Sequence, residues 1–204
     1  MFFKCFSSGM YAANCYLLAN NGKAMVIDAG VDIDEFMGVV HENHLTVELV
    51  VLTHAHIDHM TEVDLIREKT GAKAAVHKDD AIGFTDITRN GSDNHVGKRV
   101  FNPPDIILSD GDVVGIDGLG CEVIHTPGHT AGAICLKLDK MLFTGDTLFR
   151  LGVGRTDLPY AVRETLIRSI KTRLFVLEDD LEVHTGHGAC TNLGFEKKYN
   201  PAMP

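Results

Sequence analysis

The chain has 204 residues, of which 45% are hydrophobic and 23% charged, a composition typical of a soluble globular protein with a substantial core. Its formal net charge of −9 argues against nucleic acid as a partner, because such binding depends on clustered Lys and Arg. The sequence contains no run of about 18–20 apolar residues, so we expect no membrane-spanning helix. It begins without a basic segment followed by an apolar run, and we therefore predict a cytoplasmic protein.

The first half of the chain predicts strands followed by strand–helix alternation. Helical spacing predicts one helix over 32–44 and another over 61–71, which Gly71 would end. The second helix would turn Val63, Leu65 and Ile66 inward. The predicted strands cover residues 2–6, 14–20, 24–30, 48–53 and 73–77.

Residues 85–105 have a different character. This segment is polar, holds Gly, Asn and a Pro-Pro pair, and shows no periodicity. A long irregular segment in a compact domain is either a cover over a site or a solvated insertion, and the sequence leaves both interpretations open.

The second half repeats the pattern of the first. A long helix is predicted over 159–177, opened by Pro159, and a short terminal helix would follow the last strand. The predicted strands are 112–117, 121–126, 133–139, 141–146 and 181–186. We therefore predict an α/β fold, a four-layer αββα sandwich in which two mixed β-sheets pack face to face with helices outside. It would form a single domain over 1–204, with two similar halves at approximately 1–115 and 116–204.

The five cysteines are odd in number and scattered without CxxC spacing. A disulfide framework or a cysteine-based zinc site is therefore not expected. Cys15, Cys121 and Cys135 lie in apolar, strand-like runs, where we predict buried reduced thiols.

The stretch LTHAHIDHM, residues 52–60, concentrates four good metal ligands: His54, His56, Asp58 and His59. Side chains two apart in extended backbone fall on the same side, which groups His54 with His56. Asp58 and His59 are neighbours at a strand-to-helix turn. The spacing therefore favours one pair of ligands for one ion and a second pair for another ion close by.

Three further candidate ligands each follow a strand-like run, among Gly, Thr or Pro. They are His129 in IHTPGHTAG, Asp146 in LFTGDTLF and His187 in VHTGHGAC. Residues on loops at the ends of core strands commonly carry function. The full set of five His and two Asp suits Zn, Fe or Mn better than Cu(I).

The order HxHxDH, TPGHT, FTGDTLF, GRTD and GHG closely resembles the metallo-β-lactamase superfamily. Within it, the chain looks most like short members of the glyoxalase II branch, the hydroxyacylglutathione hydrolases, and their neighbours the persulfide dioxygenases. The resemblance runs from the IDAG motif at 27–30 to GHG at 186–188.

This resemblance implies a ligand set, residue by residue. One metal would be held by His54, His56 and His129, the other by Asp58, His59 and His187, with Asp146 bridging them. Asp28 in IDAG would orient a ligand histidine by hydrogen bonding, or else be a turn residue at a strand end. Arg155 and Asp157 in LGVGRTDLP would form an ion pair in a loop near the site or, for Arg155, contact substrate.

The function implied is hydrolysis of a thioester of the S-2-hydroxyacylglutathione type by a metal-bound hydroxide at a binuclear site. Two divalent ions, first of all zinc, would supply that nucleophile by lowering the pKa of water from 15.7 to about 7. Asp58 would assist in proton handling. Members that act on glutathione thioesters carry a further C-terminal helical region without a counterpart here, so the acyl donor stays open.

The alternatives are a mononuclear iron persulfide dioxygenase, another ester or lactone hydrolase of the superfamily, and a non-catalytic metal-bound scaffold. In the dioxygenase Asp58, His59 and His187 would take no part. The partner expected in the enzymatic cases is a small, anionic thioester or related molecule. The sequence does not indicate which oligomeric state the protein adopts.

Overall fold

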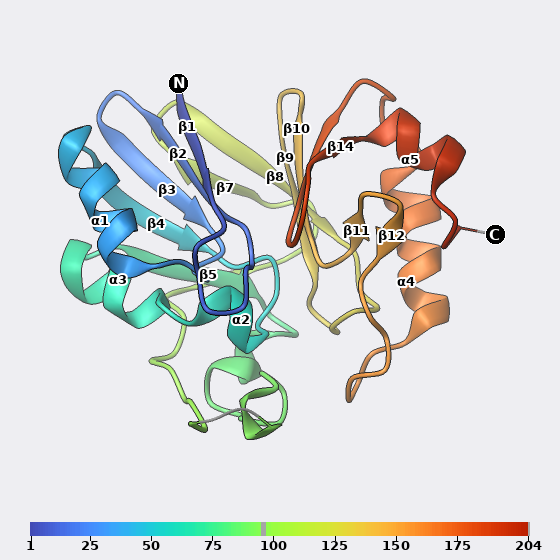
Figure 1. Cartoon of the computed structure of the whole chain (residues 1–204), viewed down its shortest axis with the longest axis horizontal. Helices are drawn as coiled ribbons and strands as arrows, with labels where there is room; N and C mark the ends of the chain where they lie inside the picture. Colours follow the sequence, from blue (N-terminus) through green and yellow to red (C-terminus); the bar gives the residue numbers. More distant parts are fainter. Residues whose placement is uncertain (95–96, 204) are drawn as a thin grey trace.

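The computed structural model describes residues 1–94 and 97–203, and its two large β-sheets pack face to face (Figure 1). The first sheet has the order β1-β2-β3-β4-β5-β6. Strands β1, β2 and β3 pair antiparallel, whereas β3 to β6 pair parallel, so the sheet is mixed. Its strands are β1 (Phe2–Phe6), β2 (Cys15–Asn20), β3 (Lys23–Ile27), β4 (Thr46–Val51), β5 (Lys73–His77) and β6 (Ile106–Leu108).

The second sheet has the order β14-β13-β10-β9-β8-β7. It is also mixed, because β10 and β13 pair parallel while the other neighbours pair antiparallel. Its strands are β7 (Val113–Ile116), β8 (Leu119–His125), β9 (Ile134–Leu138), β10 (Met141–Gly145), β13 (Glu182–Thr185) and β14 (Thr191–Asn192). A small separate hairpin joins β11 (Leu148–Phe149) to β12 (Gly152–Val153).

Helices cover the outer face of each sheet, so the predicted αββα sandwich is confirmed (Figure 1). On the first sheet lie α1 (Ile33–Glu42) and α3 (Val63–Thr70), preceded by the one-turn α2 (Ile57–Met60). On the second lie α4 (Arg163–Ser169), continued by the π-helical turn η3 (Ile170–Leu174), and α5 (Leu193–Tyr199). Asp32 caps α1 by accepting from the backbone N–H groups of Asp34 and Glu35.

Three hydrophobic layers hold these elements together. Leu17 and Leu18 are adjacent residues of β2, so their side chains point to opposite faces of the first sheet. Both side chains are fully buried. Leu17 packs with Phe36 of α1 in the layer under the helices of the first sheet. Leu18 packs with Phe143 in the layer between the two sheets. A third layer joins the second sheet to α4 and α5. The buried free thiols predicted at Cys15, Cys121 and Cys135 lie in these layers and are confirmed.

Two local predictions are wrong. Leu65 is 37% exposed, because it lies about 200° around the helix from Val63, whereas Ile66 shares the buried face of Val63. The helix expected from Pro159 begins only at Arg163. Val162 N–H donates to the carbonyl of Gly128 at 2.7 Å, so a contact with a distant loop determines where this helix begins.

Residues 81–94 and 97–105 form turns rather than a regular element, with short helical turns η1 (Ala81–Phe84) and η2 (Ser92–Asn94). His95 and Val96, within the segment predicted to be irregular, lie outside the described residues. Asn90 links the two ends of this segment, because its side-chain amide donates to the carbonyls of Gly83 and Arg99.

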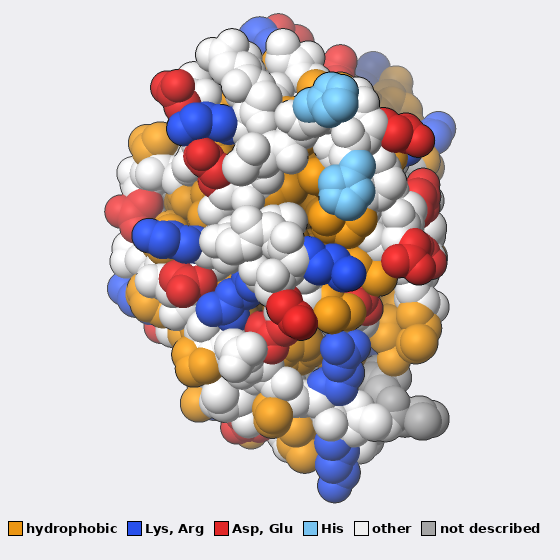
Figure 2. All heavy atoms as spheres, turned by 90° about the vertical axis from the view of Figure 1, so that its left-hand side faces the viewer, with side chains coloured by type: hydrophobic (Ala, Val, Ile, Leu, Met, Phe, Trp, Pro, Cys, Tyr) orange, Lys and Arg blue, Asp and Glu red, His pale blue; other side chains and the backbone are white. Residues whose placement is uncertain are grey.

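Figure 2 shows the face of the molecule covered by α1 and α3, where positive and negative side chains are interspersed. The described part of this face carries no extended single-sign patch. None of the helices described is long and apolar enough to cross a membrane.

Candidate metal centre

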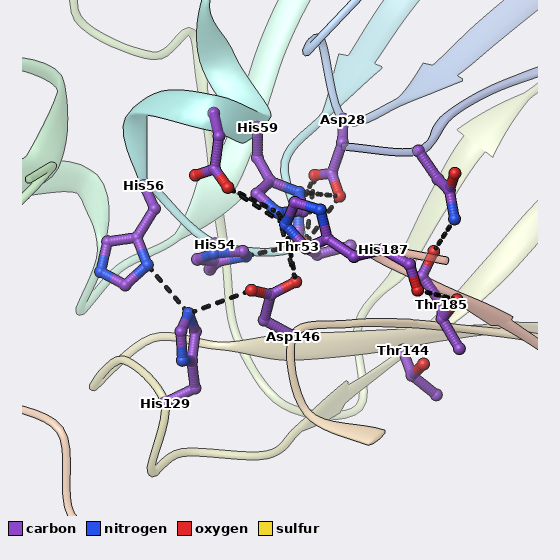
Figure 3. Close-up of polar contacts among 12 residues, drawn as sticks. Asp28, Thr53, His54, His56, His59, His129, Thr144, Asp146, Thr185 and His187 are labelled. Carbon is purple, nitrogen blue, oxygen red and sulfur yellow. Dashed lines mark hydrogen bonds and ion pairs between the residues drawn. The ribbon is translucent and has the colours of Figure 1, made fainter. Parts of the chain in front are cut away.

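The seven predicted ligands meet at one end of the sandwich, between the two sheets (Figure 3). Each follows a core strand: the HxHxDH residues come after β4, and the others come from loops after the second sheet's strands. His129 follows β8, Asp146 directly follows β10, and His187 follows β13. The strands deliver these side chains because their ends lie at the same edge of the fold.

The first group consists of His54, His56 and His129. Nδ1 of His56 lies 2.9 Å from Nε2 of His129. The ring centroid of His54 is 4.8 Å from the centroid of each of the other two rings. All three side chains offer a ring nitrogen to one small volume.

The second group consists of Asp58, His59 and His187. Nε2 of His187 lies 3.1 Å from a carboxylate oxygen of Asp58 and 3.2 Å from Nε2 of His59. This group brings α2 together with a loop almost 130 residues further along the chain.

Asp146 stands between the two groups. Its Oδ2 atom lies 3.5 Å from Nε2 of His129 in the first group. Its Oδ1 atom lies 3.2 Å from Nε2 of His59 and 3.7 Å from Nε2 of His187 in the second group. One carboxylate oxygen therefore faces each set of ligands, which is the arrangement a bridging ligand requires.

The donor atoms fit divalent cations. Nε2 of His54 is buried without a hydrogen-bond partner, an arrangement that is costly unless another group satisfies it. In the second group the Nε2 atoms of His59 and His187 lie 3.2 Å apart, and in the neutral tautomers set by their Nδ1 hydrogen bonds both direct lone pairs at a common point. Nitrogen and carboxylate oxygen donors of this kind suit zinc, iron or manganese.

In four of the histidines Nδ1 already takes part in a hydrogen bond, which leaves Nε2 free for a metal. Because a carbonyl can only accept, Nδ1 of His129 donates to the carbonyl of Arg155 at 2.9 Å, and Nδ1 of His187 donates to the carbonyl of Ala12 at 3.2 Å. His54 and His59 are fixed through Asp28, as described next. Such hydrogen bonds fix the tautomer and orientation of a ligand histidine.

Asp28 has the orienting geometry predicted for it. Its carboxylate accepts from Nδ1 of His59 at 2.8 Å, from the Thr53 hydroxyl at 2.8 Å and from the Thr53 N–H at 2.8 Å. The Thr53 hydroxyl oxygen in turn lies 3.1 Å from Nδ1 of His54 and can accept a hydrogen bond from it. One buried carboxylate thus directs a histidine of each group.

Electrostatics differ between the groups. Burial, with His129 next to it, lowers the pKa of His56 to about 3, and burial likewise lowers the pKa of His54. Burial also opposes charge on His59, but Asp28 and Asp58 outweigh it and raise the His59 pKa. The hydrogen bond that His187 donates to the Asp58 carboxylate raises the pKa of His187. Burial opposes charge on Asp58 too, yet His59 and His187 hold its pKa well below the usual range.

A pocket of about 450 Å³ opens onto the centre. Its base includes one residue or more from each group and Asp146. One wall comes from the irregular segment that the sequence left as either a cover or an insertion, and this placement favours a cover. The loop after β12 contributes lining residues as well. The lining residues other than the ligands are Tyr11, Ile57, Thr88, Asn90, Gly91, Asp93, Arg155, Leu158 and Pro159.

Arg155 and Asp157 form the predicted ion pair, with two contacts of 2.7 and 2.8 Å between guanidinium and carboxylate. Arg155 also lines the pocket, and its backbone carbonyl accepts the hydrogen bond from Nδ1 of His129.

Two glycines leave space that the centre needs. A side chain at Gly186 would overlap Oδ1 of Asp146, and one at Gly154 would overlap the Asp146 carbonyl. Gly186 of the GHG motif therefore permits close approach of backbone to the Asp146 carboxylate, and Gly154 of the GVG motif permits close approach to the Asp146 main chain.

Sequence reasoning missed Asp80. This buried carboxylate lies after β5 and connects the loop that carries His54 and His56 to the loop that carries His129. The only signal was its position: like the ligands, it is a polar residue just beyond a core strand.

One other group among the described residues, His77, Asp79 and His125, brings potential ligand atoms together. The two imidazoles are stacked at 4.1 Å with 15° between their planes. An imidazole nitrogen binds an ion in the plane of its ring, and two parallel planes this far apart cannot share one. This group is therefore a poor metal site.

A two-sheet sandwich with a cluster of His and Asp at the edge between its sheets is the arrangement typical of metallo-hydrolases. The chain belongs to the metallo-beta-lactamase superfamily, whose family model matches residues 9–187. It is 33% identical to the hydroxyacylglutathione hydrolase GloC of Haemophilus influenzae over 95% of this chain and 93% of that protein.

Two solved structures extend the comparison. BLEG-1, described as a B3 metallo-beta-lactamase, shares 31% identity and a TM-score of 0.92, covering 98% of both chains. TTHA1623, described in a di-iron-bound form, shares 29% identity and a TM-score of 0.85, covering 98% of this chain and 99% of the other.

Proposed function

We propose that this protein is a binuclear metal-dependent hydrolase that cleaves thioesters of the S-2-hydroxyacylglutathione type. The observation that carries the proposal is the position of Asp146, with one oxygen toward His129 and the other toward His59. Two complete sets of three ligands stand beside this carboxylate, and a binuclear site would use all seven residues, whereas a single iron would leave Asp58, His59 and His187 unused. The described di-iron form of TTHA1623 supports the same interpretation.

The thioester substrate is supported by the relative GloC, whose name states hydrolysis of hydroxyacylglutathione. It is also chemically suited to the site, because a thiolate leaves readily and needs little help from a general acid. Two divalent ions would supply Lewis acidity toward the carbonyl oxygen and an ionised water at neutral pH.

The chain's own residues have separate tasks in this proposal. His54, His56 and His129 would hold one ion, Asp58, His59 and His187 the other, and Asp146 both. Asp58 borders the pocket and keeps 24% of its side chain exposed, so it would exchange protons with solvent during turnover. Asp28 keeps His59 in the tautomer that presents Nε2.

The test is a hydrolysis screen on protein of measured metal content. Wild-type protein loaded separately with Zn, Mn or Fe is assayed with S-lactoylglutathione and with acyl thioesters of other thiols. We expect about two metal equivalents per chain and turnover of at least one thioester. Asp117→Asn is the matched control, because Asp117 lies at the exposed turn between β7 and β8.

Two results would overturn the proposal. A single bound iron with oxygen consumption on glutathione persulfide would assign the chain to the mononuclear dioxygenases instead. Full metal loading without turnover of any thioester, ester or lactone would favour the non-catalytic scaffold.

A second candidate is hydrolysis of a β-lactam, favoured by the likeness to BLEG-1 over the full length of both chains. The chemistry is related, since both reactions begin with attack on a carbonyl carbon. A chromogenic cephalosporin in the same screen separates the candidates by their kcat/KM values.

A further inference from the structure

Asp80 is a buried carboxylate whose hydrogen bonds come not from the ligand side chains but from both loops that carry the first group. Its Oδ2 atom accepts from the Ala55 N–H at 3.0 Å and from the Thr130 hydroxyl at 2.7 Å. Its Oδ1 atom accepts from the Gly132 N–H at 2.7 Å. The residue is 6% exposed.

These partners stand directly beside ligands. Ala55 lies between His54 and His56 in the chain, and Thr130 follows His129. The two loops are therefore joined through one carboxylate at the level of the ligands themselves. A side chain at Gly132 would overlap both the backbone and the side chain of Asp80, so the approach of the second loop is close.

The carboxylate form suits this position, because all three contacts are donated by N–H or O–H groups. An amide would present its NH₂ group to one of these donors, and that contact would be lost. Losing this contact would change the spacing of the two loops where they meet. At that point Nδ1 of His56 and Nε2 of His129 lie 2.9 Å apart.

Among the described residues, no hydrogen bond of this kind joins the second group to Asp80. Its histidine His59 is held instead by Asp28, at 2.8 Å, and His187 by the carbonyl of Ala12. The two groups are thus supported by different buried carboxylates, although Asp28 also reaches His54 through Thr53.

We propose that Asp80 is a positioning residue for the first metal: it holds the His54–His56 loop and the His129 loop at the separation that one ion requires. Its loss weakens binding at the first group and spares the second. This inference rests on the proposed function, because it takes the three histidines of the first group as metal ligands.

The test measures zinc affinity at each group separately. His187→Ala protein isolates the first group and His56→Ala protein isolates the second, and Asp80→Asn is introduced into each. Chelator competition should give an affinity about 10- to 100-fold weaker in the His187→Ala background, the range typical of lost partners around metal ligands. In the His56→Ala background the change should stay within about threefold, as expected for an uncoupled site.

Thr130→Val provides a milder variant that folds even if Asp80→Asn does not. It removes one of the three hydrogen bonds at nearly constant volume, and we expect a smaller loss confined to the first group, about threefold to tenfold. Cobalt absorption spectra of the first group should change in both variants. A merely structural role would lower the melting temperature without altering these spectra or the ratio of the two affinities.

The outcomes separate the two proposals. If the wild-type protein binds no divalent metal, the proposed function fails and this inference fails with it. If the wild type binds two ions but the Asp80→Asn and Thr130→Val changes weaken both groups equally, or neither, the inference is overturned while the proposed function stands.

Discussion

The carboxylate of Asp28 lies 2.8 Å from Nδ1 of His59, and both side chains are almost completely buried. This contact joins the turn after β3 to α2 and leaves Nε2 of His59 directed at Asp146 and His187. The IDAG motif therefore contacts the candidate centre through a histidine of the second group.

Replacing Asp28 by Asn should weaken the second metal selectively. The amide cannot accept from His59 and both Thr53 donors at once, so His59 would lose its fixed tautomer. We expect about a 10- to 100-fold loss of zinc affinity at the second group, measured by chelator competition in the His56→Ala background. Asp117→Asn, at an exposed turn, is the control. Equal affinities in variant and parent would contradict the orienting role.

Replacing Asp58 by Ala should abolish thioester hydrolysis. The substitution removes a ligand of the second ion and the carboxylate that borders the pocket. We expect kcat to fall by about 10²–10⁴-fold, the range typical of lost proton-transfer groups, and metal content to fall toward one equivalent. Turnover that stays at the wild-type level would rule out the binuclear proposal.

Gly186→Ala should disturb both metals, because the new methyl group would overlap Oδ1 of Asp146. Movement of the bridging carboxylate should lower the affinity of each group, which metal analysis after dialysis against a weak chelator would detect. Gly38→Ala is the control: Gly38 lies within α1 with no atom near the added methyl group. That control should keep both metals and gain about 0.5–1 kcal/mol of stability.

Acidification should release the second metal before the first. The raised pKa values of His59 and His187 mean that both hold protons at higher pH than usual, and each must lose its proton to bind an ion. His54 and His56 have lowered pKa values and stay neutral as the pH falls. Zinc titrations at about pH 8 and about pH 6 should show a larger affinity loss at the second group. Parallel losses at both groups would contradict this assignment.

Arg155→Ala should leave metal binding unchanged. The guanidinium is paired with Asp157 at the surface, and it is the backbone carbonyl of Arg155 that holds His129. We expect wild-type metal content and a kcat/KM within about threefold of wild type, as is usual for an exposed ion pair. A large increase in KM for anionic thioesters, with metal content intact, would instead assign the side chain to substrate binding.

Much of the fold was predictable because its signals are local. Apolar runs of strand length predicted ten strands of the two sheets at nearly their observed places, and Gly71 ends α3 in the left-handed conformation expected of a helix stop. The start of α4 was not predictable, because it depends on a hydrogen bond between Val162 and Gly128, from a loop more than 30 residues away.

The sequence by itself determined which residues are available for the centre. HxHxDH, PGHT, TGD and GHG follow core strands, and strand ends share an edge, so convergence of the seven ligands could be expected from the chain alone. Only the tertiary structure decided how they are supported and shared. Which oxygen of Asp146 faces which group depends on side-chain directions set by packing between the sheets. The role of Asp80 depends on contacts 25 to 52 residues apart, which no local pattern encodes.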